Sequence, residues 1–158
     1  MKLVIDARYT RITHHDGISR YTAGLIEAAS KVADVTMLVN DTRQLGMLPD
    51  VPHLKISGPT SVLEPFVALQ VNKLNPDVVF SPMQTMGTVG RKYPVILTLH
   101  DLIYYSHPHA PKFLPLPIRA GWFLFHQVYW PQRMLLNRAD AVATVSNTTA
   151  KLMRKHRL

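Results

Sequence analysis

The sequence predicts an α/β fold built on a doubly wound parallel sheet. Two observations lead to this prediction. The expected strands are apolar along almost their whole length, as parallel strands covered on both faces are, and segments with helical spacing separate them. The chain has 158 residues, of which 47% are hydrophobic, and this is enough for a single domain with a sizeable core.

Short apolar runs mark the strands. Each run suits a buried strand better than a helix because of its length, and polar or turn-forming residues flank it. Between residues 41 and 60, Pro, Asp and Gly are frequent, which predicts mainly loop. The expected strands are residues 2–7, 35–39, 78–81, 95–100 and 141–146, with one further short strand at 53–56.

Four segments have the periodicity of amphipathic helices. We expect Asp16 or Gly17 to open the first, and Ser146 or Asn147 to open the last, since these residue types cap helix N-termini. In the second, Pro65 falls near the first turn, where proline is tolerated. The expected helices span residues 18–32, 61–74, 118–137 and 147–156. Their predicted apolar sides are Ile18, Tyr21, Leu25, Ala29 and Val32 in the first helix, and Val62, Phe66, Leu69 and Leu74 in the second.

Residues 106–117 are expected to form a structured loop or lid. They contain four of the twelve prolines, which excludes regular helix or a central strand there. The helix predicted after them is rich in aromatic residues. Trp122, Phe125 and Tyr129 share one face of it, which favours packing in the core over insertion into a membrane surface.

The carboxyl ends of parallel strands are the expected place for a ligand. Segments that follow strand ends hold nearly all of the chemically suggestive residues in the chain. These segments are residues 10–17, 81–90, 100–108 and 146–149.

Gly17 lies at the start of a predicted helix. Backbone N–H groups at such a position, together with the helix dipole, can bind phosphate or another anion, and glycine lets the ligand approach closely. From the spacing alone, a glycine that merely turns the chain is the favoured interpretation. The pattern G-x-G-x-x-G is absent, which argues against a dinucleotide site.

His100 and Asp101 follow an apolar strand directly. An imidazole there can donate a hydrogen bond to a substrate hydroxyl or act as an acid or base. The alternative is structural, with His100 capping the strand end and Asp101 capping the next turn. The residues alone do not separate these two interpretations.

Charge is distributed unevenly. Of 18 basic and 10 acidic residues, the second half of the chain holds ten basic residues but only Asp101 and Asp140 as acids. This predicts an anionic partner such as nucleic acid, anionic lipid or a sugar phosphate. There is no cysteine, and the eight histidines lack a paired-ligand motif, so no metal site is predicted.

Four motifs in order resemble the N-terminal domain of the family-four retaining glycosyltransferases, and in particular its mannosyltransferase-like members. They are D-A-R at 6–8, D-G-I-S-R-Y-T at 16–22, H-D-L-I-Y-Y-x-H-P at 100–108 and A-D-A-V-A-T-V-S at 139–146. The resemblance covers the whole chain and implies a Rossmann-like domain, the N-terminal half of a GT-B fold. In that family this half receives the acceptor, and a C-terminal half binds the nucleotide sugar.

The resemblance also implies roles for individual residues. Gly17 would lie near the donor diphosphate, and His100 and Asp101 would be the catalytic pair, with His100 beside the transferred sugar. Arg20 and Ser146 fall within matching segments and are assigned to substrate or diphosphate binding. Ser19 stands where many relatives have a second glycine.

The implied activity is transfer of a hexose, mannose or glucose, from a nucleotide diphosphate sugar to a glycan or lipid-linked acceptor, with retention and without a metal or other cofactor. Residues 1–158 would be the acceptor-side domain, with the donor-binding domain absent, so we expect this chain alone to be inactive. We expect a cytoplasmic protein, with peripheral contact to the inner face of the plasma membrane and no nucleic-acid partner. The alternative function is a basic α/β module that binds nucleic acid or phospholipid.

Overall fold

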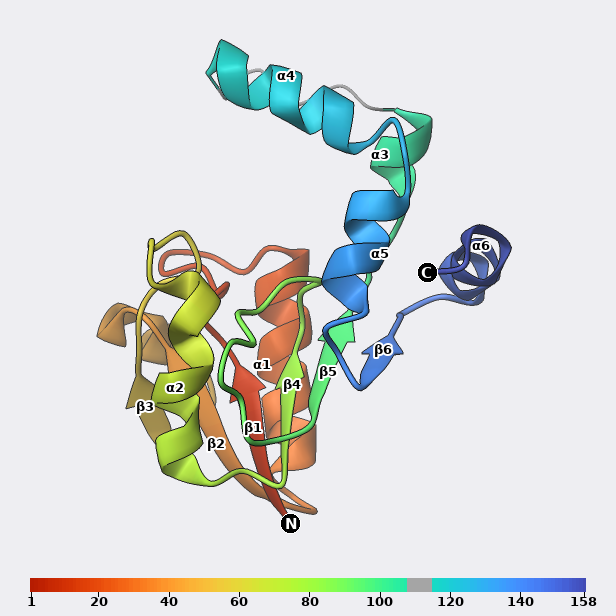
Figure 1. Ribbon diagram of the computed structural model, residues 1–158. Helices are drawn as coiled ribbons and strands as arrows, with labels where there is room; N and C mark the ends of the chain where they lie inside the picture. The colour runs from red at the N-terminus through yellow and green to blue at the C-terminus, as the bar shows by residue number, and fades with distance from the viewer. Residues whose placement is uncertain (108–114) are drawn as a thin grey trace.

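The computed structural model describes residues 1–107 and 115–158 of the chain. Its centre is a six-stranded sheet with the order β3-β2-β1-β4-β5-β6, in which every neighbouring pair is parallel (Figure 1). This confirms the predicted fold class. The strands are β1 (Lys2–Asp6), β2 (Asp34–Val39), β3 (His53–Lys55), β4 (Val78–Ser81), β5 (Val95–Thr98) and β6 (Ala141–Ala143).

Helices cover both faces of the sheet, α1 on one and α2 on the other (Figure 1). Alternate residues of each strand pack against the helices on opposite faces of the sheet, because successive side chains point to opposite faces. Val4 packs in the cluster that contains Val67 and Val71 of α2, while Ile5 packs with Ile26 of α1. The helices are α1 (Gly17–Ala29), α2 (Val67–Val71), α3 (Ile103–Ser106), α4 (Leu116–Phe125), α5 (Trp130–Leu136) and α6 (Asn147–His156). Three 3₁₀ turns, η1 (Thr42–Met47), η2 (Glu64–Phe66) and η3 (Asn72–Leu74), complete the list.

The strand order reverses beside β1. The chain runs outward from β1 to β2 and β3, then returns to place β4 on the other side of β1. Loops that leave β1 and β4 therefore diverge at the carboxyl edge, which is where ligands bind in sheets of this kind. The side chain of Tyr9 spans this point, its hydroxyl lying 3.4 Å from the carbonyl oxygen of Thr85.

The predicted caps agree with the structure at both helices. Asp16 caps α1 by accepting a hydrogen bond from the Ser19 N–H, and Ser146 caps α6 by accepting one from the Thr149 N–H. The predicted C-terminal end of the first helix is wrong. The helix ends at Ala29, and Val32 lies in the following turn with 86% of its surface exposed.

The single helix predicted for residues 61–74 is wrong in extent and in orientation. The segment consists of η2, α2 and η3, and three of the four residues on the predicted apolar side are exposed, Val62 by 91%; Leu74 alone of them packs against the core. Val67, Ala68 and Val71 are buried instead. The reason is a buried ion pair, because Glu64 must point inward to meet Arg8 and this contact sets the rotation of the segment.

The long helix predicted for residues 118–137 is two helices, α4 and α5, with a break between them. Pro131 lies in the first turn of α5 and has no N–H to continue the hydrogen-bond ladder of α4, so the chain restarts there. The predicted loop of residues 106–117 is wrong at its end, since α4 begins at Leu116. Residues 108–114 of that loop lie outside the described residues. Helix α3 was not predicted.

Within the described residues, no helix combines the length and the apolar composition needed to cross a membrane.

Gly87 offers a test of how tightly the carboxyl edge is packed. A β-carbon added at Gly87 would lie 1.7 Å from the backbone oxygen of Glu64, so the backbone has to move to accept alanine. We expect Gly87→Ala to lower the free energy of unfolding by about 2 kcal/mol. Gly46→Ala is the control, because no atom lies within 4 Å of its added carbon. Equal urea midpoints for the two variants would contradict the close packing.

Candidate functional site

Two cavities adjoin at the carboxyl edge of the sheet, and Ile18 and Met83 line both. The first, of about 650 Å³, is surrounded mainly by polar residues, and we name it the polar cavity. The second, of about 810 Å³, is surrounded mainly by aromatic and aliphatic residues, and we name it the aromatic cavity. His100 and Asp101 line the aromatic cavity.

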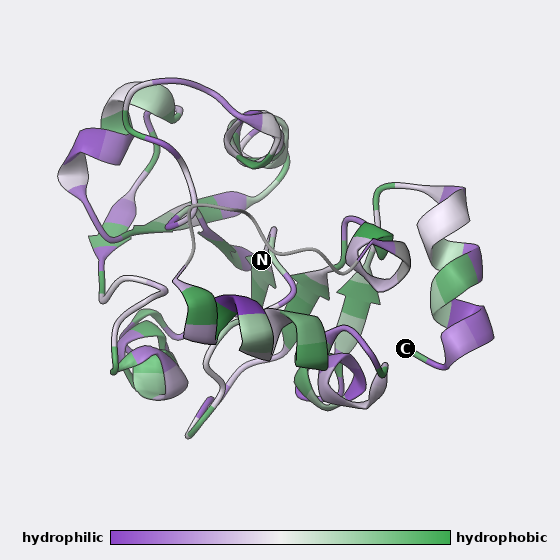
Figure 2. Ribbon diagram, turned by 90° about the horizontal axis from the view of Figure 1, so that it is seen from above, coloured by the Kyte–Doolittle hydropathy of each residue, from purple (hydrophilic) through white to green (hydrophobic). Residues whose placement is uncertain are grey.

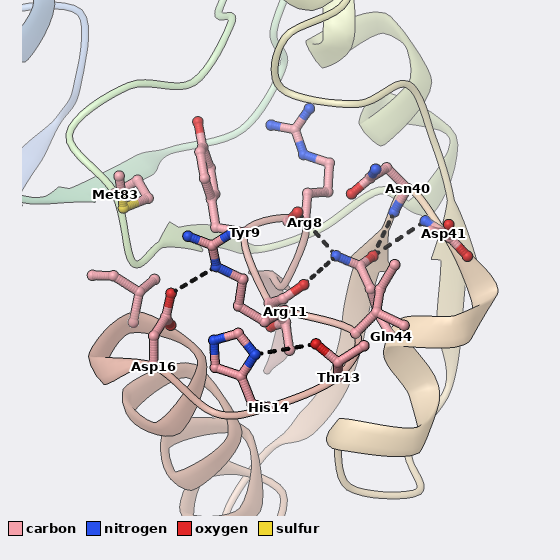
Figure 3. A pocket seen from close by; sticks show the side chains of 13 residues that line it. Arg8, Tyr9, Arg11, Thr13, His14, Asp16, Asn40, Asp41, Gln44 and Met83 are labelled. Carbon is pink, nitrogen blue, oxygen red and sulfur yellow. Dashed lines mark hydrogen bonds and ion pairs between the residues drawn. The ribbon is translucent and has the colours of Figure 1, made fainter. Parts of the chain in front are cut away.

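The polar cavity is formed by the loop after β1 and the loop after β2 (Figure 3). Gln44, which is 3% exposed, joins these loops. Its Nε2 donates to the carbonyl oxygens of Arg8 and Thr10 at 3.0 and 2.8 Å. Its Oε1 accepts from the backbone N–H groups of Asn40 and Asp41 at 3.0 and 3.2 Å. One buried amide therefore fixes the shape of this half of the site.

Asp16 lies between the polar cavity and α1. Its Oδ1 accepts from the N–H and the hydroxyl of Ser19, at 2.8 and 2.7 Å, and its Oδ2 accepts from Nε of Arg11 at 3.0 Å. Partial burial alone would raise the pKa of the Asp16 carboxyl. The hydrogen bonds from Ser19 and the ion pair with Arg11 outweigh that effect and lower the pKa to about 2. Asp16 therefore stays ionised at neutral pH.

His100 is half-buried at the end of β5. Its Nε2 lies 2.7 Å from the carbonyl oxygen of Pro82. A carbonyl can only accept, so Nε2 carries the proton, and Nδ1 of the neutral ring is left as an acceptor. The ring of Tyr21 on α1 meets the imidazole edge to face, with centroids 5.4 Å apart. Both contacts hold the ring in one orientation at the cavity wall.

Thr149 connects His100 to the last helix. Its hydroxyl donates to the carbonyl oxygen of His100 at 3.1 Å and lies 2.9 Å from the hydroxyl of Ser146. Ser146, by capping α6, is part of the same arrangement. The structure thus brings the predicted residues His100 and Ser146 together through a residue for which no role was predicted.

The remaining predicted residues lie close by, though not all of them line a cavity. Gly17 is the first residue of α1, in the same helix as Tyr21, and a β-carbon there would meet open space. Arg20 is exposed on the same helix. Gly17, Arg20 and Ser146 line neither cavity. Asp101 accepts from the N–H of Ile103 at 3.1 Å, so it supports the turn into α3.

Sequence reasoning missed Gln44, and it included Thr149 only as the end of the segment 146–149, without a role of its own. A signal for Gln44 exists, because Asp41 followed three residues later by Gln is the pattern of a capping box, and the structure contains that box. No local pattern marks Thr149, since its role comes from a contact with a strand end 49 residues away.

The aromatic cavity is bounded by α3, α4 and α5. His126 is at the centre of an aromatic group, with ring centroids 4.8 Å from Trp122, 5.0 Å from Phe125 and 5.1 Å from Tyr105. Burial raises the pKa of the Tyr105 hydroxyl to about 12. Trp122 and Phe125 pack against other rings, but the predicted packing of these residues in the core is wrong, because no residue of α4 is buried.

Among residues 1–107 and 115–158, no three His, Asp or Glu side chains lie close enough together to hold a metal ion.

Comparison with known families gives a match over most of the chain. The sequence model of the family described as Glycosyltransferase Family 4 matches residues 15–158. The matched range begins just before the cap of α1 and includes the segments of Gly17, His100 and Ser146. No curated protein matches the chain.

Replacement of Asp16 tests the electrostatics of the polar cavity. The folded-state pKa of about 2 lies below the ordinary value of 3.8, so the carboxylate stabilises the fold above about pH 4, and this stabilisation is lost as the pH falls to 2. Asp16→Asn preserves capping. At pH 6 we expect the free energy of unfolding of the wild type to be higher than that of this variant by up to about 1 kcal/mol. The difference is modest because the ion pair with Arg11 is largely exposed to solvent.

Urea unfolding of both proteins between pH 6 and pH 2.5 measures this difference. It should shrink on acidification, and also in 1 M salt, where exposed ion pairs are screened. A difference that is constant across the pH range would show that the Asp16 charge contributes nothing.

Proposed function

The chain belongs to glycosyltransferase family 4, and on this premise we propose that it is the acceptor-side, N-terminal domain of a retaining hexosyltransferase. The reaction is transfer of mannose or glucose from a nucleotide diphosphate sugar to a glycan or lipid-linked acceptor. An acceptor hydroxyl replaces the nucleoside diphosphate at the anomeric carbon, and the anomeric configuration is kept.

One observation carries the proposal: His100 is held at the wall of a cavity at the carboxyl edge, and its contact with the Pro82 carbonyl assigns a proton to Nε2. Because Nε2 donates to Pro82, the neutral ring presents Nδ1, which accepts a hydrogen bond from a sugar hydroxyl. Tyr21 and Thr149 fix the ring and its backbone. Such preorganisation lets the group orient the transferred sugar without rearranging during the reaction.

Three residues are proposed for the donor side. Gly17 begins α1, where backbone N–H groups and the helix dipole favour a diphosphate, and its missing side chain leaves room for close approach. Arg20, exposed on the same helix, supplies a positive charge, and Ser146 orders the start of α6. Asp101 keeps the loop after His100 in place through its bond to Ile103.

We propose that a second domain supplies the rest of the nucleotide-sugar site and that no metal is required. The acceptor lies on the side of the domain described here. A cytoplasmic location with peripheral contact to the inner membrane face fits the excess of basic residues in the second half of the chain. The alternative, a basic module for nucleic acid or phospholipid, has only this charge in its favour.

The proposal is tested by nucleotide-sugar turnover. The chain is assayed alone and joined to a donor-binding domain of the family, with GDP-mannose and UDP-glucose as donors and release of the nucleoside diphosphate as the signal. We expect activity only in the joined protein, and we expect His100→Ala to lower kcat/KM by about 100-fold, as loss of a positioned polar group at a reacting centre does.

His53→Ala serves as the matched control, because His53 is exposed at the start of the edge strand β3 and lines neither cavity. Thermal unfolding of each variant checks that the fold is kept. Full activity in the joined His100→Ala protein would show that His100 is not part of the reacting site. Strong turnover by the chain alone would contradict the proposal that a second domain is needed to bind the nucleotide sugar. The anomeric configuration of the product, measured by NMR, tests retention.

A further inference from the structure

We propose that the aromatic cavity binds the hydrocarbon part of an amphiphilic acceptor, so that this enzyme acts on a lipid-linked acceptor and not on a soluble glycan. The inference rests on the proposed function, which supplies the reaction at His100. It adds the chemical class of the acceptor and the place where its apolar part is held.

The walls of the cavity suit a hydrocarbon. Trp122 and Phe125 of α4, Leu102 and Tyr104 around α3, and Leu135 of α5 line it. The rings are locked by mutual contacts, with Tyr104 and Trp122 perpendicular at 4.9 Å. A volume of about 810 Å³, mostly apolar walls and a few polar groups are the usual properties of a site for a small organic molecule.

Helix α4 is apolar on the side away from the cavity as well. Leu116, Phe123 and Leu124 are 75%, 47% and 68% exposed. A helix with apolar residues all round normally lies in an apolar environment. Figure 1 shows α4 lying beyond the carboxyl ends of the strands, away from the sheet, and Figure 2 shows hydrophobic residues along its length. The outer wall of the cavity is therefore suited to contact lipid.

Charge around this region favours a membrane over a second protein domain as the source of that environment. Between residues 102 and 158 the only acidic residue is Asp140, and Arg91 neutralises it at 2.6 Å. Lys151, Arg154 and Lys155 are exposed on α6. Exposed apolar side chains combined with unopposed basic ones are typical of proteins that bind anionic lipid.

The cavity also contains polar groups suited to the junction between hydrocarbon and headgroup. Gln132 is 1% exposed, and its Nε2 has no hydrogen-bond partner within the described residues. The same holds there for Nε1 of Trp122 and the hydroxyl of Tyr105. All three atoms are themselves buried, and each can donate, so a side-chain rotation that turns them into the cavity would match them to phosphate or carbonyl oxygens. Because His100 lines the same cavity, an acceptor hydroxyl beyond the headgroup would reach the reacting centre.

Gly121 permits a direct test. It lines the cavity, and a β-carbon there meets no atom within 4 Å, so Gly121→Leu adds a larger apolar side chain at the cavity wall and its first carbon has room. Gly24→Leu is the matched control, since Gly24 is also inside a helix with open space around it but lines neither cavity. Both changes remove a helix glycine, so neither should destabilise its helix.

The probe is farnesyl phosphate below its critical micelle concentration, with binding measured by calorimetry and inorganic phosphate as the reference. We expect farnesyl phosphate to bind at least tenfold more tightly than phosphate. Gly121→Leu should weaken this binding at least tenfold, and Gly24→Leu should leave it unchanged. Equal binding of the two probes, or equal binding by the two variants, would overturn the inference.

Two further outcomes separate this inference from the proposed function. Loss of farnesyl phosphate binding when a donor-binding domain is joined would identify the cavity as a domain interface, which overturns the inference alone. His100-dependent transfer to a soluble glycan without farnesyl phosphate binding would do the same. Gly121-dependent binding without any transferase activity in the joined protein would support the cavity assignment and overturn the proposed function.

Discussion

The carboxyl edge of this sheet depends on a buried ionic group formed by Arg8, Asp6 and Glu64. All five N–H donors of Arg8 are used: Asp6 accepts two at 2.8 and 2.9 Å, Glu64 accepts two, and the carbonyl of Ser57 accepts the fifth at 3.0 Å. Burial alone would lower the pKa of the Arg8 guanidinium, but Asp6 and Glu64 outweigh it and raise the pKa. Loss of one partner from such a group costs about 3 to 5 kcal/mol, because a buried charge is left uncompensated.

This ionic group links the elements that build the site. Asp6 ends β1. Glu64 begins η2, which leads into α2, and its Oε1 accepts a hydrogen bond from the N–H of Gly87 at 3.2 Å. The loops after β1 and β4 are thereby held on either side of the point where the strand order reverses. Buried ion pairs add little net stability compared with an apolar core, but they permit few alternative arrangements. A ligand site at the carboxyl edge requires polar groups of fixed geometry. Apolar side chains at this edge would instead be buried in the hydrophobic core.

Much of the fold was predictable because it depends on local patterns. Continuous apolar runs identified five of the six strands, and the caps Asp16 and Ser146 follow from residue type. The short strand β3 has no such run and was expected only as a brief strand within a loop-rich segment. Errors occurred where a distant contact overrides a local pattern. Val62 carried part of a predicted apolar side, yet it is exposed because Glu64 must face Arg8. His100 could be predicted as a residue at a strand end, but its orientation depends on Pro82 and Thr149, which no spacing in the sequence indicates.

The two sides of the site differ in how they are stabilised, and this difference bears on the acceptor. Buried hydrogen bonds of Gln44 and the ionic group fix the polar side before any ligand arrives. The aromatic side has ring contacts but no buried residue in α4, so much of the apolar surface of this helix stays in contact with water. Covering that surface lowers the free energy roughly in proportion to the area removed from water. An acceptor with a hydrocarbon part would gain the free energy of covering the apolar surface of α4 when its hydroxyl is placed beside His100. A soluble glycan would leave that apolar surface exposed to water.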